Sequence, residues 1–84
     1  INCARGGLVD DSAALDALMS GQLGGYGTDV LPQEPPRDGH ILLDALPRPL
    51  NLIVTPHNAW ITPEARQNLI NKTADNIREF LMTR

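Results

Sequence analysis

Three residues in this sequence have side chains suited to acid–base and anion chemistry: Arg5 in "INCARGG", Glu34 in "PQEPP" and His57 in "VTPHNAW". An imidazole gains or loses a proton near neutral pH. A carboxylate on one ring nitrogen favours the imidazolium and fixes the ring orientation. A guanidinium offers a planar fork of donors to a substrate carboxylate or carbonyl. Together these groups suit the reduction of a 2-oxo acid.

Each of the three residues also has a purely structural interpretation. Arg5 can form an ion pair within a loop, Glu34 can be a solvated loop charge, and His57 can be a packed ring at the end of a strand. The residues are far apart in the sequence, so only the fold can bring them together. The functional interpretation therefore depends on which elements precede them.

Strand-like segments precede all three residues. Residues 1–2 resemble the end of a strand, residues 25–31 form a short strand among small residues, and "LNLIVTP" is an apolar, β-rich run interrupted by Pro56. In an open parallel sheet, the carboxyl ends of the strands lie at one edge, where ligands bind. The sequence therefore predicts that Arg5, Glu34 and His57 converge at that edge.

Helices are predicted between and after these strands. Asp10 or Asp11 caps a helix that Gly21 ends, and its apolar residues recur at spacings of three and four. "HILLDAL" forms a helical turn within a proline-rich loop. Thr62 caps the longest helix and Pro63 starts it. The glycines of "GQLGGYGTDV" precede a strand instead of opening a helix, so they do not form a phosphate-binding turn.

This alternation of elements predicts an α/β fold with a parallel sheet. The chain starts without methionine and without a cap, so we expect a piece of a longer protein. We expect residues 1–60 to belong to this sheet and its crossovers. Residues 61–84 are expected to form a long helix that crosses back and packs on a second domain outside this sequence.

Composition excludes several classes of function. The chain has 84 residues, a net charge of -3 and no basic stripe, which argues against nucleic-acid binding. A single cysteine forms no internal disulfide, and the cysteine and two histidines lack metal-ligand spacing, so we expect no metal site. We see no membrane span and no charged leader. We therefore expect a soluble, cytoplasmic protein that does not bind membranes.

Three separated blocks resemble the C-terminal part of the D-isomer-specific 2-hydroxyacid dehydrogenases: N-x-A-R-G-G-x-V-D, D-V-x-x-x-E-P and T-P-H. They occur in the family's order, and the resemblance covers nearly the whole chain. It implies that residues 1–60 are the C-terminal part of a Rossmann-type, doubly wound, nucleotide-binding domain. The resemblance implies NAD(P)-dependent interconversion of a 2-oxo acid and a D-2-hydroxy acid, with a homodimeric full-length protein. It assigns the catalytic arginine to Arg5, the glutamate to Glu34 and the acid–base histidine to His57.

The resemblance also implies cofactor contacts, with NAD or NADP as the cofactor, from the following residues: Cys3, Ala4, Arg5, Asp29, His57, Asn58, Ala59 and Trp60. Asp29 can equally cap a loop, and Cys3 can be a small apolar filler. Trp60 can be architectural, although its spacing from His57 resembles family members that act as glycerate dehydrogenases or hydroxypyruvate reductases. The alternative to an enzyme is a shortened, non-catalytic relative that serves as a binding or dimerisation module.

Overall fold

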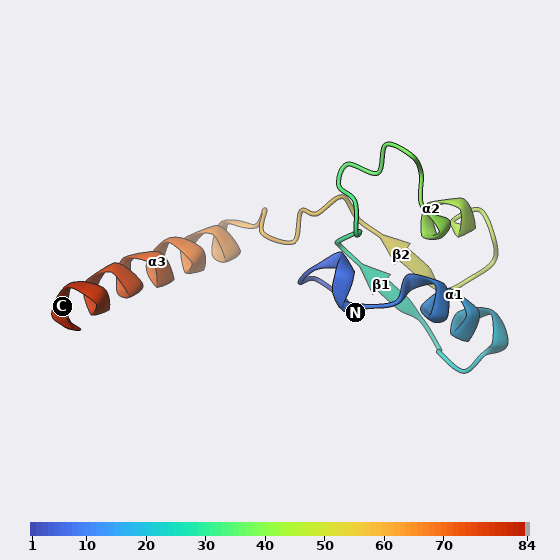
Figure 1. Ribbon diagram of the computed structural model, residues 1–84, viewed down its shortest axis with the longest axis horizontal. Helices are drawn as coiled ribbons and strands as arrows, with labels where there is room; N and C mark the ends of the chain where they lie inside the picture. The colour runs from blue at the N-terminus through green and yellow to red at the C-terminus, as the bar shows by residue number, and fades with distance from the viewer. Residues whose placement is uncertain (84) are drawn as a thin grey trace.

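The computed structural model describes residues 1–83; Arg84, the end of the predicted 61–84 segment, lies outside the described residues. Its elements follow in chain order as η1 (Gly6–Leu8), α1 (Asp11–Ser20), β1 (Tyr26–Thr28), α2 (Ile41–Ala45), β2 (Leu52–Val54) and α3 (Pro63–Thr83). The two strands and the first two helices form the body of the molecule, and α3 extends away from it (Figure 1). The predicted alternation of helices and strands is confirmed.

The capping residues at the two ends of α1 explain where the helix begins and ends. The Asp10 side chain accepts a hydrogen bond from the backbone N–H of Ala13 at 3.1 Å, which satisfies one of the donors left open at a helix N-terminus. Gly21 ends the helix with a φ of 80°, a conformation that glycine adopts without a Cβ clash. Both predicted boundaries are confirmed.

The sheet is parallel, with Tyr26, Gly27 and Thr28 of β1 opposite Leu52, Ile53 and Val54 of β2. Asn2 adds a single parallel bridge to Thr28 on the other side of β1, so a strand end does precede Arg5. Strand β1, at Tyr26–Thr28, is shorter than the strand predicted over residues 25–31. The reason is local: the Val30 N–H donates to the Thr28 hydroxyl at 3.3 Å instead of extending the ladder.

The core lies between one face of the sheet and the helices α1 and α2. Its buried residues are Leu18, Tyr26, Leu31 and Leu42, with Leu52 and Val54 packed against them. Ile53 points to the opposite face and is 63% exposed. At Gly6 a Cβ would collide with the backbone of Leu31, so a glycine there lets the Arg5 loop lie directly against the segment that leads to Glu34.

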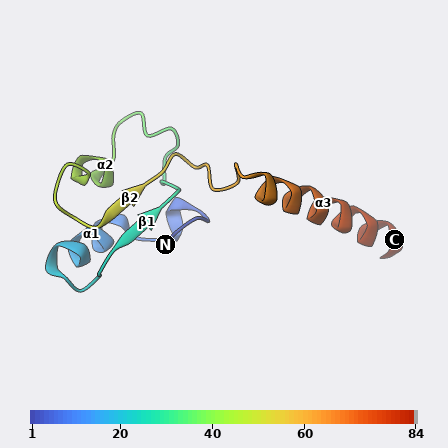
Figure 2. The same cartoon turned by 180° about the vertical axis from the view of Figure 1, so that it is seen from behind.

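The long helix α3 begins as predicted, because the Thr62 hydroxyl accepts from the Ala65 N–H at 3.1 Å and Pro63 is the first helical residue. No residue of α3 is buried. Its apolar residues are exposed, among them Leu69, Ile70, Ile77, Phe80 and Leu81. Two opposite views show it directed away from the sheet (Figures 1 and 2). Within residues 1–83, no helix has the length and apolar character needed to cross a membrane.

Candidate functional site

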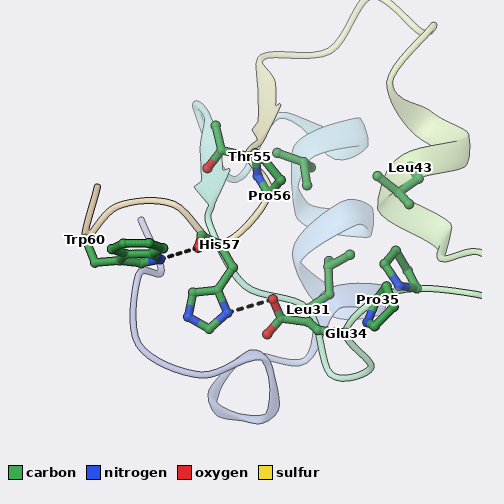
Figure 3. A pocket seen from close by; sticks show the side chains of 10 residues that line it. Leu31, Glu34, Pro35, Leu43, Thr55, Pro56, His57 and Trp60 are labelled. Atoms are coloured by element: carbon green, nitrogen blue, oxygen red, sulfur yellow. Dashed lines mark hydrogen bonds and ion pairs between the residues drawn. The ribbon is translucent and has the colours of Figure 1, made fainter. Parts of the chain in front are cut away.

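An imidazole–carboxylate pair forms where the chain leaves β2. His57 Nδ1 lies 2.8 Å from Glu34 Oε2, and the side chains of the two residues are 40% and 33% exposed (Figure 3). An ionised carboxylate only accepts hydrogen bonds, so Nδ1 carries the proton that points at Glu34. The second ring nitrogen, Nε2, is then available to exchange a proton with a bound molecule. The predicted proximity of Glu34 and His57 is confirmed, although they are 23 positions apart.

The pair lies at the wall of a largely apolar cavity of about 610 Å³. Glu34, His57 and Trp60 line it, together with Leu31, Pro35, Pro36, Leu43, Val54, Thr55 and Pro56. Concave, mostly apolar sites with a few convergent polar groups are typical of small-molecule binding. The cavity is therefore a candidate substrate site with an acid–base group at its wall.

His57 has an uncommon backbone conformation, with a φ of 54°. The left-handed region disfavours a non-glycine residue by roughly 1–2 kcal/mol, so the surrounding loop must hold it there. Its own N–H donates to the Thr55 carbonyl at 3.1 Å, and its carbonyl accepts from Trp60 Nε1 at 2.8 Å. The loop thus fixes the direction in which the imidazole leaves the backbone.

Asp29 holds the same loop from the end of β1. Oδ1 accepts from the Thr55 hydroxyl at 2.6 Å and from the Asn58 N–H at 2.9 Å, while Oδ2 accepts from the Ala59 N–H at 2.9 Å. These partners are 26 to 30 positions away in the sequence. Asp29 is therefore a loop cap, which was one of its two predicted roles.

The hydrogen bond from Thr55 is the main reason why the pKa of Asp29 lies below its ordinary value of 3.8. Burial opposes this shift, because it penalises the charged form. The amides of Ala59 and Asn58 and the nearby His57 lower the pKa further. Asp29 is consequently ionised at neutral pH, and its charged carboxylate accepts the hydrogen bonds that shape the loop.

The lowered pKa predicts how stability depends on acid. An unfolded chain binds a proton at Asp29 near pH 3.8, whereas the folded chain resists it. Asp29 thus stabilises the fold fully above that pH, and its contribution is lost as pH falls through the lower, folded value. In Asp29→Asn the group does not titrate, and its amide NH₂ faces a backbone donor. We expect this variant to be less stable at pH 7 and to lose less free energy of unfolding on acidification.

Urea unfolding of both proteins at several pH values between neutrality and strong acid measures this difference. The other carboxylates are shared by the two proteins, so they do not contribute to the difference between the curves. Parallel curves for wild type and Asp29→Asn would contradict the role given to Asp29.

A second cavity, of about 260 Å³, lies beside the first. Four residues with a predicted cofactor contact line it, namely Cys3, Asp29, Asn58 and Ala59. Thr55 lines both cavities and so forms part of a shared wall. The carboxylate of Asp29 and the small side chains around it fit a carboxamide-bearing ring such as a nicotinamide. His57 and Trp60 line the first cavity instead.

Arg5 does not join the pair. Its side chain is exposed, and Nη1 donates to the neighbouring Ala4 carbonyl at 3.1 Å. Neither Ala4 nor Arg5 lines either of the two cavities. The structure brings Glu34 and His57 together, whereas the Arg5 guanidinium donates within its own loop. A place for Arg5 beside the pair stays a prediction.

Two polar residues that shape the site were missed by sequence reasoning. Thr55 donates to Asp29, and buried Asn2 holds the Arg5 loop by donating to the Arg5 carbonyl at 3.0 Å and accepting from the Ala4 N–H at 3.1 Å. Asn2 begins the block N-x-A-R-G-G-x-V-D and Thr55 begins the block T-P-H. Their places in these blocks were the available signal. Across residues 1–83, no group of three His, Cys, Asp or Glu side chains is arranged to hold a metal ion.

Curated proteins similar to this chain are named as dehydrogenases or reductases. The chain is 57% identical over 82 residues to a glycerate dehydrogenase of Methylorubrum extorquens, which covers 96% of this chain and 25% of the relative. A hydroxypyruvate reductase of Blautia hydrogenotrophica is 37% identical over 81 residues, covering 96% of this chain and 24% of the relative. A D-3-phosphoglycerate dehydrogenase of Bacillus subtilis is 39% identical over 80 residues, covering 95% and 14%. The chain thus spans a quarter or less of the length of these three relatives.

A protein-family comparison identifies the domain. Residues 1–59 match the family model described as D-isomer specific 2-hydroxyacid dehydrogenase, NAD binding domain. This segment contains β1, β2 and the His57–Glu34 pair, and α3 follows it. The chain accordingly belongs to the D-isomer-specific 2-hydroxyacid dehydrogenases, and residues 1–59 belong to that family's NAD-binding domain.

Proposed function

We propose that this chain is part of an oxidoreductase that transfers a hydride between a nicotinamide cofactor and a 2-oxo acid, giving a D-2-hydroxy acid. The observation that supports this most strongly is the His57–Glu34 pair at 2.8 Å on the wall of an apolar cavity. Such a pair supplies a proton to an oxygen that becomes an alkoxide when its carbon is reduced. Family membership supports the same reaction class.

In this proposal His57 is the acid–base residue and Glu34 its partner. The Nε2 proton goes to the substrate oxygen during reduction and returns to Nε2 during oxidation. Glu34 stabilises the imidazolium and keeps Nδ1 turned away from the substrate. Arg5 grips the substrate carboxylate through its guanidinium, which requires the side chain to leave the Ala4 carbonyl to which it is bound.

The cofactor is proposed to lie against the second cavity. Cys3 and Asp29, which line this cavity, would hold the nicotinamide end, with the 57–60 loop beside it. Ala4 and Arg5 lie outside the lining and would contact the cofactor from the adjoining loop. When bound, the nicotinamide supplies or accepts the hydride. Thr55 lines both cavities, so a 2-oxo acid bound beside it would have the cofactor on one side and the imidazole on the other. We propose NAD or NADP as the cofactor, since residues 1–59 match an NAD binding domain model.

We propose hydroxypyruvate or glyoxylate as the substrate, since a glycerate dehydrogenase and a hydroxypyruvate reductase are among the relatives. We propose a homodimer for the complete protein, and the cytoplasm as its compartment, since the one cysteine is free and exposed. We also propose that residues 1–60 belong to the nucleotide-binding domain. The exposed apolar residues of α3 would then pack on a substrate domain, and residues 61–84 would make that connection.

A cofactor-oxidation assay on the complete gene product tests the proposal. We expect loss of NADH or NADPH absorbance with hydroxypyruvate or glyoxylate, and weaker activity with bulkier 2-oxo acids. Chiral analysis of the product should give the D-2-hydroxy acid. A folded protein that oxidises neither cofactor with any member of the panel would contradict the dehydrogenase proposal and favour a non-catalytic binding module.

A further inference from the structure

We infer that Trp60 is a positioning residue for His57, acting through the peptide bond that joins His57 to Asn58. This inference rests on the proposed dehydrogenase function, because it gives Trp60 a part in the same site. The family resemblance implied a cofactor contact for Trp60. The structure instead directs its indole N–H to the backbone of the acid–base residue (Figure 3).

Both ends of that peptide bond are held by side chains. Trp60 Nε1 donates to the His57 carbonyl at 2.8 Å, and Asp29 Oδ1 accepts from the Asn58 N–H at 2.9 Å. A peptide unit is planar, so fixing its oxygen and its nitrogen fixes the orientation of the whole plane. Trp60 and Asp29 therefore clamp the same peptide from opposite ends.

The clamp matters because His57 has a φ of 54°, a conformation that a histidine rarely adopts unless its surroundings impose it. On the other side of its Cα, the His57 N–H donates to the Thr55 carbonyl at 3.1 Å. With the peptide planes on both sides fixed, the direction of the Cα–Cβ bond is fixed. That direction brings Nδ1 to 2.8 Å from Glu34 Oε2.

Burial alone does not explain a tryptophan at this position, because Trp60 is 54% exposed in the described chain. Its indole N–H, however, donates to the His57 carbonyl, and its ring lines the same cavity as the imidazole. A phenylalanine would keep an aromatic ring there but would leave the His57 carbonyl without its indole donor. The N–H is therefore the feature of Trp60 that the site uses.

Steady-state kinetics of the complete protein test the inference with two changes. Trp60→Phe keeps an aromatic ring without a donor, and incorporation of benzothienylalanine keeps the bicyclic shape but replaces N–H by sulfur. We expect both to lower kcat about 10-fold, as for a misplaced catalytic group. The KM values for cofactor and 2-oxo acid, and the thermal unfolding temperature, should stay close to wild type. Ile61→Ala, at a residue 55% exposed on the same loop, is the control and should leave kcat unchanged.

Other outcomes would overturn the inference. Full kcat in the benzothienylalanine protein would show that the N–H is not needed. A rise in the KM for NADH with unchanged kcat would make Trp60 a cofactor contact instead. NMR of the His57 Nδ1–H proton tests the clamp without turnover: we expect the resonance to broaden in both altered proteins, and an unchanged resonance would refute the clamp. An inactive wild type would contradict the proposed function alone.

Discussion

His57→Ala is expected to lower kcat of the complete protein by at least about 10²-fold, the usual contribution of a general acid. In the proposed mechanism the imidazole exchanges the proton. It lies on the wall of the larger of the two cavities, where Glu34 and the loop fix its position. Removing the ring removes the proton donor but leaves the residues around the second cavity in place. The KM for the cofactor should therefore change much less than kcat. Initial rates at saturating cofactor, with hydroxypyruvate varied, measure both quantities.

The chain offers a matched control in its other histidine. His40 Nε2 lies 3.1 Å from Asp11 Oδ2, so it also belongs to an imidazole–carboxylate pair. That pair is in the body of the molecule, where His40 caps α2 by accepting from the Leu42 N–H at 3.1 Å. We expect His40→Gln to lower thermal stability while kcat stays near wild type. Unchanged turnover in folded His57→Ala would remove His57 from the mechanism.

Glu34→Gln is expected to lower kcat by about 10²-fold, because acid–base catalysis by the ring depends on its charged partner. Glutamine preserves the size of the side chain and can still accept one hydrogen bond, but it carries no charge to stabilise the imidazolium. The Glu34 carboxylate is only 33% exposed, so solvent screens its charge in part. Glu34→Asp, which keeps the charge on a shorter side chain, should retain more activity than Glu34→Gln. Glu64→Gln makes the same change on α3 and should have no effect on kcat.

A double variant separates a partner role from an independent one. If Glu34 acts through the imidazole, Glu34→Gln should cause no further loss once His57 is alanine, because effects of residues that act as a unit are not additive. Rates of the two single variants and the double variant complete the cycle. Additive losses, or full activity in Glu34→Gln, would show that the 2.8 Å contact is not part of the mechanism.

Local chemistry made much of the fold predictable from the sequence. The caps of α1, at Asp10 or Asp11 and at Gly21, and the start of α3 after Thr62 depend on contacts within about four residues. The structure confirms them, with Asp10 as the N-terminal cap of α1. The order of strands and helices also followed from periodicity and proline placement. The strand expected over 25–31 was too long, because a side-chain hydroxyl competed with the ladder for a backbone donor.

The meeting of Glu34 and His57 at the edge of the sheet was predictable, but the contacts that position them were not. Parallel strands place their carboxyl ends together whatever the side chains are, which is why the sequence anticipated Glu34 beside His57. The remaining details depend on how loops of many residues return to the sheet. They include the binding of Arg5 to its own loop, the three hydrogen bonds from the 55–59 segment to Asp29, and the left-handed backbone of His57. The hydrogen bonds to Asp29 join residues 26 to 30 positions apart, and spacing in the sequence does not indicate which distant residues meet. The Arg5 and His57 geometries depend on where their loops lie, so only the tertiary structure decided these details.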